Sequence, residues 1–161
     1  MPLLLSLLLA SCLSFPQAGE ACHAEKTVDA TAELVLTNMQ PVGRILVPAE
    51  IRSAPLPYLE IPLSAISNSE RMPFSIFASL ERRHHGAVQR IVLGNFTPYP
   101  ADQTGSFMLR AAKGFEKLKE MGPDLEGDQT FLLLEMKRVH ADKPWASVRV
   151  TIAPVHWRSD L

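Results

Sequence analysis

The stretch SVRVTIAPV (residues 147–155) decides the fold class, because its apolar and polar side chains alternate. Val148, Val150 and Ile152 fall on one face of an extended chain, and the polar residues between them fall on the other. This period of two is typical of an antiparallel strand with one face on a core and the other in solvent. The stretch therefore predicts a half-buried β-strand near the C-terminus.

Short apolar runs of the same kind recur from about residue 30 onward, separated by Pro, Gly, Asn and Asp. PFSIFASLER (73–82) and AVQRIVLGNF (87–96) flank RHHGA, a connection of hairpin length whose glycine can adopt a positive φ. FLLLEMKRV (131–139) is apolar on both faces for several residues, which favours a central strand covered on both sides. These runs predict a sheet-rich domain.

One segment follows a helical period instead. In RAAKGFEKLKEMG (110–122), Ala111, Phe115 and Leu118 recur at helical spacing, and Gly122 ends the segment. We expect this helix to be short, because Gly114 costs about 1 kcal/mol relative to alanine. With no other helix to cross between parallel strands, the pattern predicts an antiparallel β-sandwich of seven or eight strands and one short helix over residues 31–161.

Residues 1–21 have the character of an export signal, since their apolar run is shorter than the roughly 20 residues of a membrane-spanning helix. LASC (9–12) matches a lipobox, in which Cys12 is lipidated, whereas Gly19 and Ala21 offer the small residues of a simple cleavage site. Residues 22–30 are then a linker. The predicted location is the periplasm, the membrane by way of a lipid anchor, or the secreted fraction.

The charge, the cysteines and the motifs of the sequence exclude several classes of function. The formal net charge of −1 gives no basic footprint for nucleic acid. The two cysteines, Cys12 and Cys22, are not expected to form an intrachain disulfide, because either processing route uses or removes Cys12. No nucleophile elbow and no glycine-rich phosphate loop occurs in the sequence, so we expect no enzyme and no catalytic residues.

Two pairs of residues are candidate metal ligands. Cleavage after Ala21 would bring a free amine, the Cys22 thiol and the His23 imidazole together, and such ligands suit copper. His84 and His85 are a second pair, in the predicted hairpin turn. The alternative is that the first pair belongs to a linker and the second to a solvated turn.

GNFTPYPADQTGSF (94–107) is the candidate recognition loop. Each proline fixes its own φ and restricts the residue before it, so Tyr99 is presented between two prolines at low entropic cost. Phe96 precedes it at the end of a predicted strand. The alternative is a proline-rich corner whose tyrosine packs back on the sheet.

The order of features from Gly94 onward resembles a known family. A strand ends in GNF (94–96), a Pro-Asp-Gly loop follows, GSF (105–107) opens a strand, and a short helix, the acidic loop DLEGD (124–128) and VRVTIAP (148–154) come next. This order, over roughly residues 55–157, resembles the C-terminal β-sandwich domain of tyrosinases and polyphenol oxidases, the type-3 copper oxidases. The resemblance implies a jelly-roll-like sandwich that covers or helps to mature a copper domain, and it assigns none of the family's copper-binding histidines to this sequence.

From these observations we expect an exported, non-catalytic accessory protein that binds another exported protein, with a copper oxidase as the partner that the resemblance implies. Phe96 and Tyr99 are its candidate contact residues, and no cofactor is expected. The alternative function is a small copper-handling protein of the cell envelope that uses Cys22, His23, His84 and His85. A carbohydrate-binding sandwich is a third interpretation, for which the aromatic residues are few and dispersed.

Overall fold

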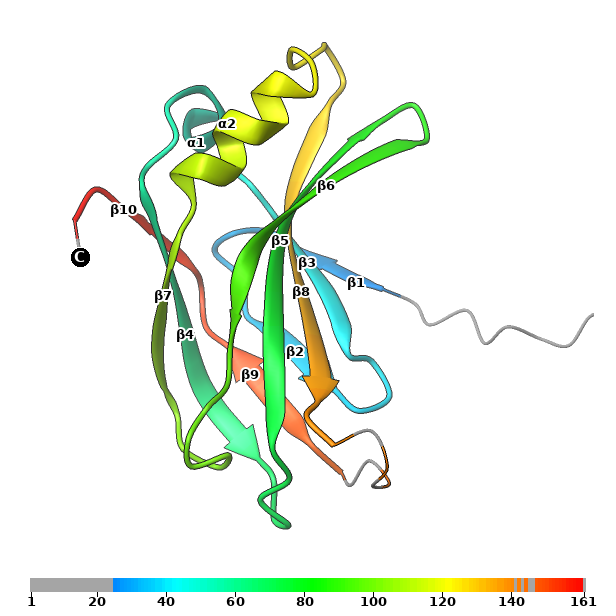
Figure 1. The fold of residues 1–161 in the computed structure, drawn as a ribbon, viewed down its shortest axis with the longest axis vertical. Coiled ribbons are helices and arrows are strands. Elements are labelled where there is room, and N and C mark those ends of the chain that lie inside the picture. The colour runs from blue at the N-terminus through cyan, green and yellow to red at the C-terminus, as the bar shows by residue number, and fades with distance from the viewer. Residues whose placement is uncertain (1–24, 141, 143, 145–146, 161) are drawn as a thin grey trace, which may run out of the picture.

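Two β-sheets pack face to face in the computed structural model, which describes residues 25–140, 142, 144 and 147–160 (Figure 1). Its ten strands are β1 (Lys26–Val28), β2 (Leu34–Thr37), β3 (Val42–Leu46), β4 (Tyr58–Ser67), β5 (Phe74–His84), β6 (Ala87–Phe96), β7 (Gly105–Arg110), β8 (Gln129–Arg138), β9 (Arg149–Ile152) and β10 (His156–Arg158). Two helices, α1 (Ala49–Ser53) and α2 (Ala112–Glu120), complete the described elements.

The first sheet has the strand order β1-β3-β8-β5-β6. Its pairs are antiparallel except for β1 with β3, which is parallel. The central position of β8 confirms the prediction from FLLLEMKRV, and five successive residues of this strand, 130–134, are buried. The β5–β6 hairpin turns at His85 and Gly86, whose φ angles of 43° and 89° match the primed turns that suit a two-residue hairpin.

The second sheet is organised around β4, which pairs on both edges. Leu63 pairs with Gly105 of β7 and also with Ile152 of β9, so these two strands flank β4 on opposite sides. β10 pairs with the other end of β4 and β2 pairs with β9. Pro62 lies next to an irregularity in the pairing of β4 with β9, which is where a strand tolerates proline.

The core is the single apolar layer between the two sheets. Alternate residues of the facing strands point into it, among them the fully buried Leu34, Leu36, Ile61, Ile76, Leu80, Leu132, Leu134, Val150 and Ile152. Val148, Val150 and Ile152 are all buried, as the alternation in SVRVTIAPV predicts. The mainly β, sandwich-like fold is thereby confirmed.

The number of elements differs from the prediction of seven or eight strands and one helix. β1 and β10 have three residues each and α1 has five, too few for a period to be recognised in the sequence. β1 lies in the segment expected to be a linker, and its pairing with β3 makes Lys26–Val28 part of the sheet. Most connections lead from one sheet to the other; only β5–β6 and β9–β10 stay within a sheet.

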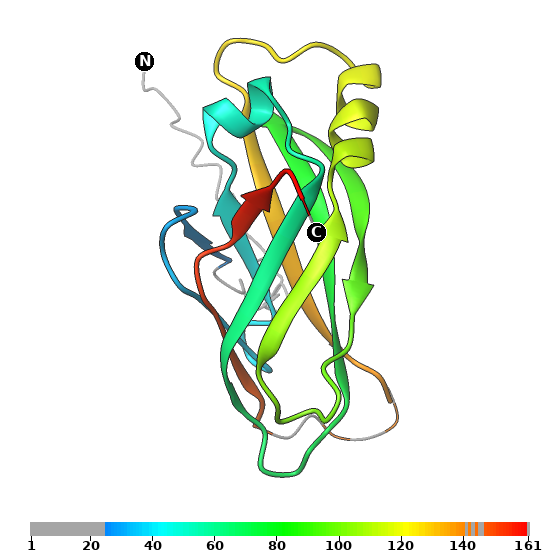
Figure 2. The same cartoon turned by 90° about the vertical axis from the view of Figure 1, so that its left-hand side faces the viewer.

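Both helices lie at one end of the sandwich (Figure 2). α2 packs against this end through Phe115 and Leu118, as the helical spacing predicts. Gly114 packs closely on β6, because a Cβ at this position would lie 2.3 Å from Cδ2 of Leu93, whose side chain would have to shift. Neither helix of the described chain has the length and apolar character needed to span a membrane.

Replacing Gly43 by alanine should destabilise the fold, since a Cβ on this buried β3 residue would lie 2.6 Å from Cδ1 of the fully buried Leu34. We expect Gly43→Ala to lower the free energy of unfolding by about 1–3 kcal/mol, the usual cost of overpacking a core. Urea denaturation measures this change. Gly105→Ala is the matched control, because nothing lies within 4 Å of a Cβ there. Equal stability of the two variants would contradict the packing described here.

Candidate functional site

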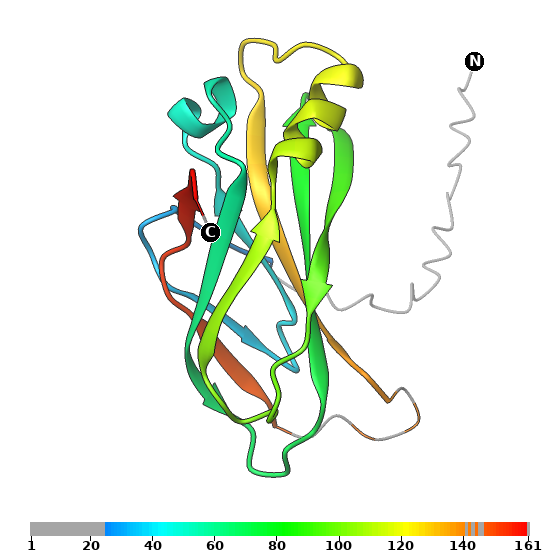
Figure 3. The same ribbon diagram turned by 60° about the vertical axis from the view of Figure 1, so that its left-hand side comes forward.

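The loop of residues 97–104 joins β6 to β7 at the end of the sandwich away from the helices (Figure 3). Within it Tyr99 is 95% exposed. Pro98 before it is buried and Pro100 after it is partly buried. The tyrosine therefore projects from a loop whose neighbouring residues pack against the protein.

Asn68 anchors this loop to the end of β4. Its side chain is 4% exposed, and its Nδ2 donates hydrogen bonds to the carbonyl oxygens of Ala101 at 3.0 Å and Met72 at 2.9 Å. Its Oδ1 accepts a hydrogen bond from the backbone N–H of Met72 at 2.9 Å. A surface ion pair of 2.8 Å between Arg71 Nε and Asp102 Oδ2 joins the same two segments.

Phe96 and Tyr99 have different environments. Phe96 is 9% exposed and stacks on Phe107 with 4.2 Å between ring centroids, so it belongs to the core. Thr97 is linked through its hydroxyl to that of Ser75 at 2.6 Å. Of the two candidate contact residues, Tyr99 is the one at the surface, and Phe96 supports the base of the loop.

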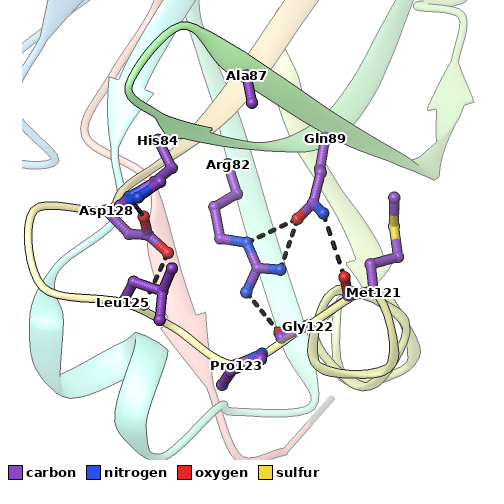
Figure 4. A pocket seen from close by; sticks show the side chains of 9 residues that line it. All are labelled: Arg82, His84, Ala87, Gln89, Met121, Gly122, Pro123, Leu125 and Asp128. Atoms are coloured by element: carbon purple, nitrogen blue, oxygen red, sulfur yellow. Dashed lines mark hydrogen bonds and ion pairs between the residues drawn. The ribbon is translucent and has the colours of Figure 1, made fainter.

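A pocket of about 200 Å³ lies at the opposite end, between the β5–β6 hairpin, the end of α2 and the loop before β8 (Figure 4). His84 lines it and its Nδ1 contacts Oδ1 of the buried Asp128. Asp128 Oδ2 also accepts the backbone N–H of Leu125 at 2.9 Å, and this hydrogen bond and the nearby His84 lower the pKa of Asp128. The pair has the arrangement in which a carboxylate orients an imidazole.

Arg82 occupies the floor of this pocket and is fully engaged. Its guanidinium donates to the carbonyl oxygens of Leu118 at 3.0 Å and Gly122 at 2.9 Å, which lie at the C-terminal end of α2. It also contacts Asp124 at 2.8 Å and Gln89 at 2.9 Å. Since a cation at this position satisfies the last carbonyls of a helix, Arg82 has a structural role.

The described lining of the pocket offers His84 no partner for nucleophilic chemistry. Its lining residues include no Ser, Thr, Cys or Lys that His84 would activate as a nucleophile. The His84 and His85 rings lie 4.3 Å apart, but among the described residues no group of three or more His, Cys, Asp or Glu side chains is placed to hold a metal ion. Cys12, Cys22 and His23 lie outside the described residues.

A second cluster, which the sequence analysis did not find, surrounds Glu81 on the outer face of the first sheet. The Glu81 side chain is 0% exposed, and its Oε1 accepts hydrogen bonds from Arg44 at 2.8 Å and Arg83 at 2.7 Å. Its Oε2 accepts from Arg90 at 2.7 Å. Glu25 pairs with Arg44 from the other side. Both oxygens of Glu81 are therefore occupied by cations, and this cluster is a structural one.

Only part of this cluster has a signal in the sequence. A two-residue turn at His85 and Gly86 places Arg90 opposite Glu81, so this pair follows from the hairpin alone. Arg44 lies 37 residues before Glu81, and its position depends on β8 lying between the two strands. Comparison with known protein families and with curated proteins found no match to this chain.

Removal of the Asn68 side chain should release the loop. Asn68→Ala leaves three backbone groups of Met72 and Ala101 without their partner, so we expect a loss of about 2–3 kcal/mol of stability. We also expect the amide hydrogens of residues 97–104 to exchange faster in Asn68→Ala than in the wild type. The exposed Asn95 on β6 serves as control, and Asn95→Ala should change neither quantity. Unchanged exchange in Asn68→Ala would mean that the loop is held by other contacts.

Acid should weaken the Glu81 cluster. Burial alone would raise the pKa of Glu81, but the three arginines lower it from 4.5 to about 2. Because the folded chain has the lower pKa, this carboxylate stabilises the fold above pH 4.5, and the stabilisation is lost as the pH falls toward about 2. The contribution is at most about 3 kcal/mol. Urea denaturation of the wild type and of Glu81→Gln measures it, and their difference in stability should shrink over this range. A difference independent of pH would contradict this assignment.

Proposed function

We propose that this protein is a non-catalytic β-sandwich that binds another protein through the loop of residues 97–104, with Tyr99 as its central contact. The observation that carries the proposal is the 95% exposure of Tyr99 on a loop anchored by the buried Asn68. Tyrosine is enriched among the residues that dominate binding energy at protein interfaces. A loop that is already ordered loses little conformational entropy when it binds.

Two features of the sequence extend this proposal to a cellular location and a class of partner. Its first 21 residues have the pattern of an export signal, so the partner is proposed to be another exported protein. The resemblance to the sandwich domain of type-3 copper oxidases makes such an oxidase the first partner to test. In that setting Tyr99 would enter or cover the partner's substrate pocket.

The alternative of a copper-handling protein has less support from the described residues. His84 faces Asp128, and among the described residues the imidazole that lies beside it is that of His85. A copper site would therefore depend on Cys22 and His23, which lie outside the described residues. Copper titration of the mature protein, followed by its absorption spectrum, tests this alternative directly.

The experiment for the proposed function begins with a photo-crosslinking amino acid at position 99 in the cell that produces the protein. Mass spectrometry then identifies the crosslinked protein, and its affinity for the purified domain is measured by calorimetry. We expect Tyr99→Ala to raise Kd by about 30-fold or more, which corresponds to about 2 kcal/mol. The unfolding temperature should stay unchanged, because the exposed ring contributes little to the core.

Two further variants separate the role of the ring from general effects. Tyr99→Phe should keep most of the affinity if the ring fills an apolar pocket. Met39, which is 69% exposed and lies between β2 and β3, is the control site, and Met39→Ala should leave Kd unchanged. Equal affinities of the wild type and Tyr99→Ala would refute the proposed role of the loop.

A further inference from the structure

A groove of about 220 Å³ lies between β6 and the beginning of α2, next to the end of β7. Three residues of β6 form one wall, and three basic residues line the other side, namely Ile91, Val92 and Leu93 on the first and Arg110, Lys113 and Lys117 on the second. The close packing of Gly114 against Leu93 sets the distance between the helix and the strand.

The three cations of this groove have no ion-pair partner among the described residues, although Glu116 and Glu120 of α2 lie three residues after Lys113 and Lys117. Each is exposed, and the ion pairs and hydrogen bonds of residues 25–140 include none of their side chains. Lys113 and Lys117 are four residues apart on α2, a spacing at which like charges repel. The lining of the groove itself contains these three cations and no acidic residue, in a chain whose overall net charge is −1.

The β6 wall of the groove is open to a partner. β6 is the outermost strand of its sheet and pairs only with β5 in the described part of the chain. Val92 on this strand is 69% exposed. An unpaired strand edge offers backbone hydrogen bonds to an extended segment of another protein, with side-chain contacts at alternate positions.

We infer that this groove binds an extended acidic segment of a partner protein, with its carboxylates on Arg110, Lys113 and Lys117 and an apolar side chain against Val92. The complementary charge provides selectivity and a faster association, and the strand edge provides the direction of the segment. The volume of about 220 Å³ suits one or two side chains and is below the range of about 300–1,000 Å³ of small-molecule sites. This surface lies beside α2, at the end of the sandwich opposite the loop of residues 97–104 (Figure 3), and does not depend on the proposed role of that loop.

The test uses a fluorescein-labelled peptide of alternating Glu and Val, six residues long, as the probe, and a peptide of alternating Lys and Val as its control. Fluorescence anisotropy with the full chain should show binding of the acidic peptide that weakens as salt is added, and none of the basic one. NMR shifts of the backbone amides of residues 91–93 and 110–117 should accompany binding. Binding of both peptides alike would overturn the inference.

Charge-reversal variants inside and outside the groove test the same inference. We expect the double variant Arg110→Glu with Lys113→Glu to weaken binding of the acidic peptide by about tenfold or more. The fold should be kept, because a carboxylate in the first turn of α2 suits the helix dipole. Lys119→Glu makes the same kind of change on the same helix outside the groove, and it should leave the affinity unchanged, as should Tyr99→Ala.

Three further outcomes would overturn the inference. The first is an equal loss of affinity in Lys119→Glu, which would mean that only net charge matters. The second is undiminished binding by the double variant. The third is saturation of the groove by anionic vesicles or inorganic phosphate under conditions in which the acidic peptide does not bind.

Discussion

The apolar layer between the two sheets is the constraint on which the rest of this structure depends. Each main strand turns alternate side chains into this layer, so its polar residues must lie on an outer face or at an end of the sandwich. The ends consist of loops and the two short helices, and both the Tyr99 loop and the His84 pocket lie there. A rigid sandwich with variable ends is a common basis for recognition, because binding residues gain their order from the scaffold.

Glu81 is an exception to this division between a buried apolar layer and exposed polar faces. Its carboxylate lies on the outer face of the first sheet and is nevertheless out of contact with water. Such burial is tolerated only when hydrogen-bonded cations compensate the lost hydration, and three arginines from β3, β5 and β6 do so. The cluster therefore joins β3, β5 and β6 on the face of the first sheet that is turned away from the apolar layer. Because its charged groups are paired with one another, we regard it as a structural element and not a binding site.

The two proposed contact surfaces differ in their physical basis. The Tyr99 loop offers one exposed aromatic ring on a backbone that is already ordered, which favours a compact apolar pocket in the partner. The groove beside α2 offers positive charge and an unpaired strand edge, which favour an extended acidic chain. Because the two surfaces lie at opposite ends of the sandwich, either one large partner or two separate partners would occupy both of them.

The sequence by itself determined the features that depend on neighbouring residues. Alternation of apolar side chains predicted the β-sandwich, the HHG turn predicted the β5–β6 hairpin, and the spacing of Phe115 and Leu118 predicted α2. Only the tertiary structure decided the features that join distant segments: the burial of Phe96 against Phe107, the anchoring of the Tyr99 loop by Asn68, and the approach of Arg44 to Glu81. The physical reason is that local periodicity specifies which face of a strand is apolar, whereas the order of strands and their register arise from packing between parts of the chain that no local pattern relates.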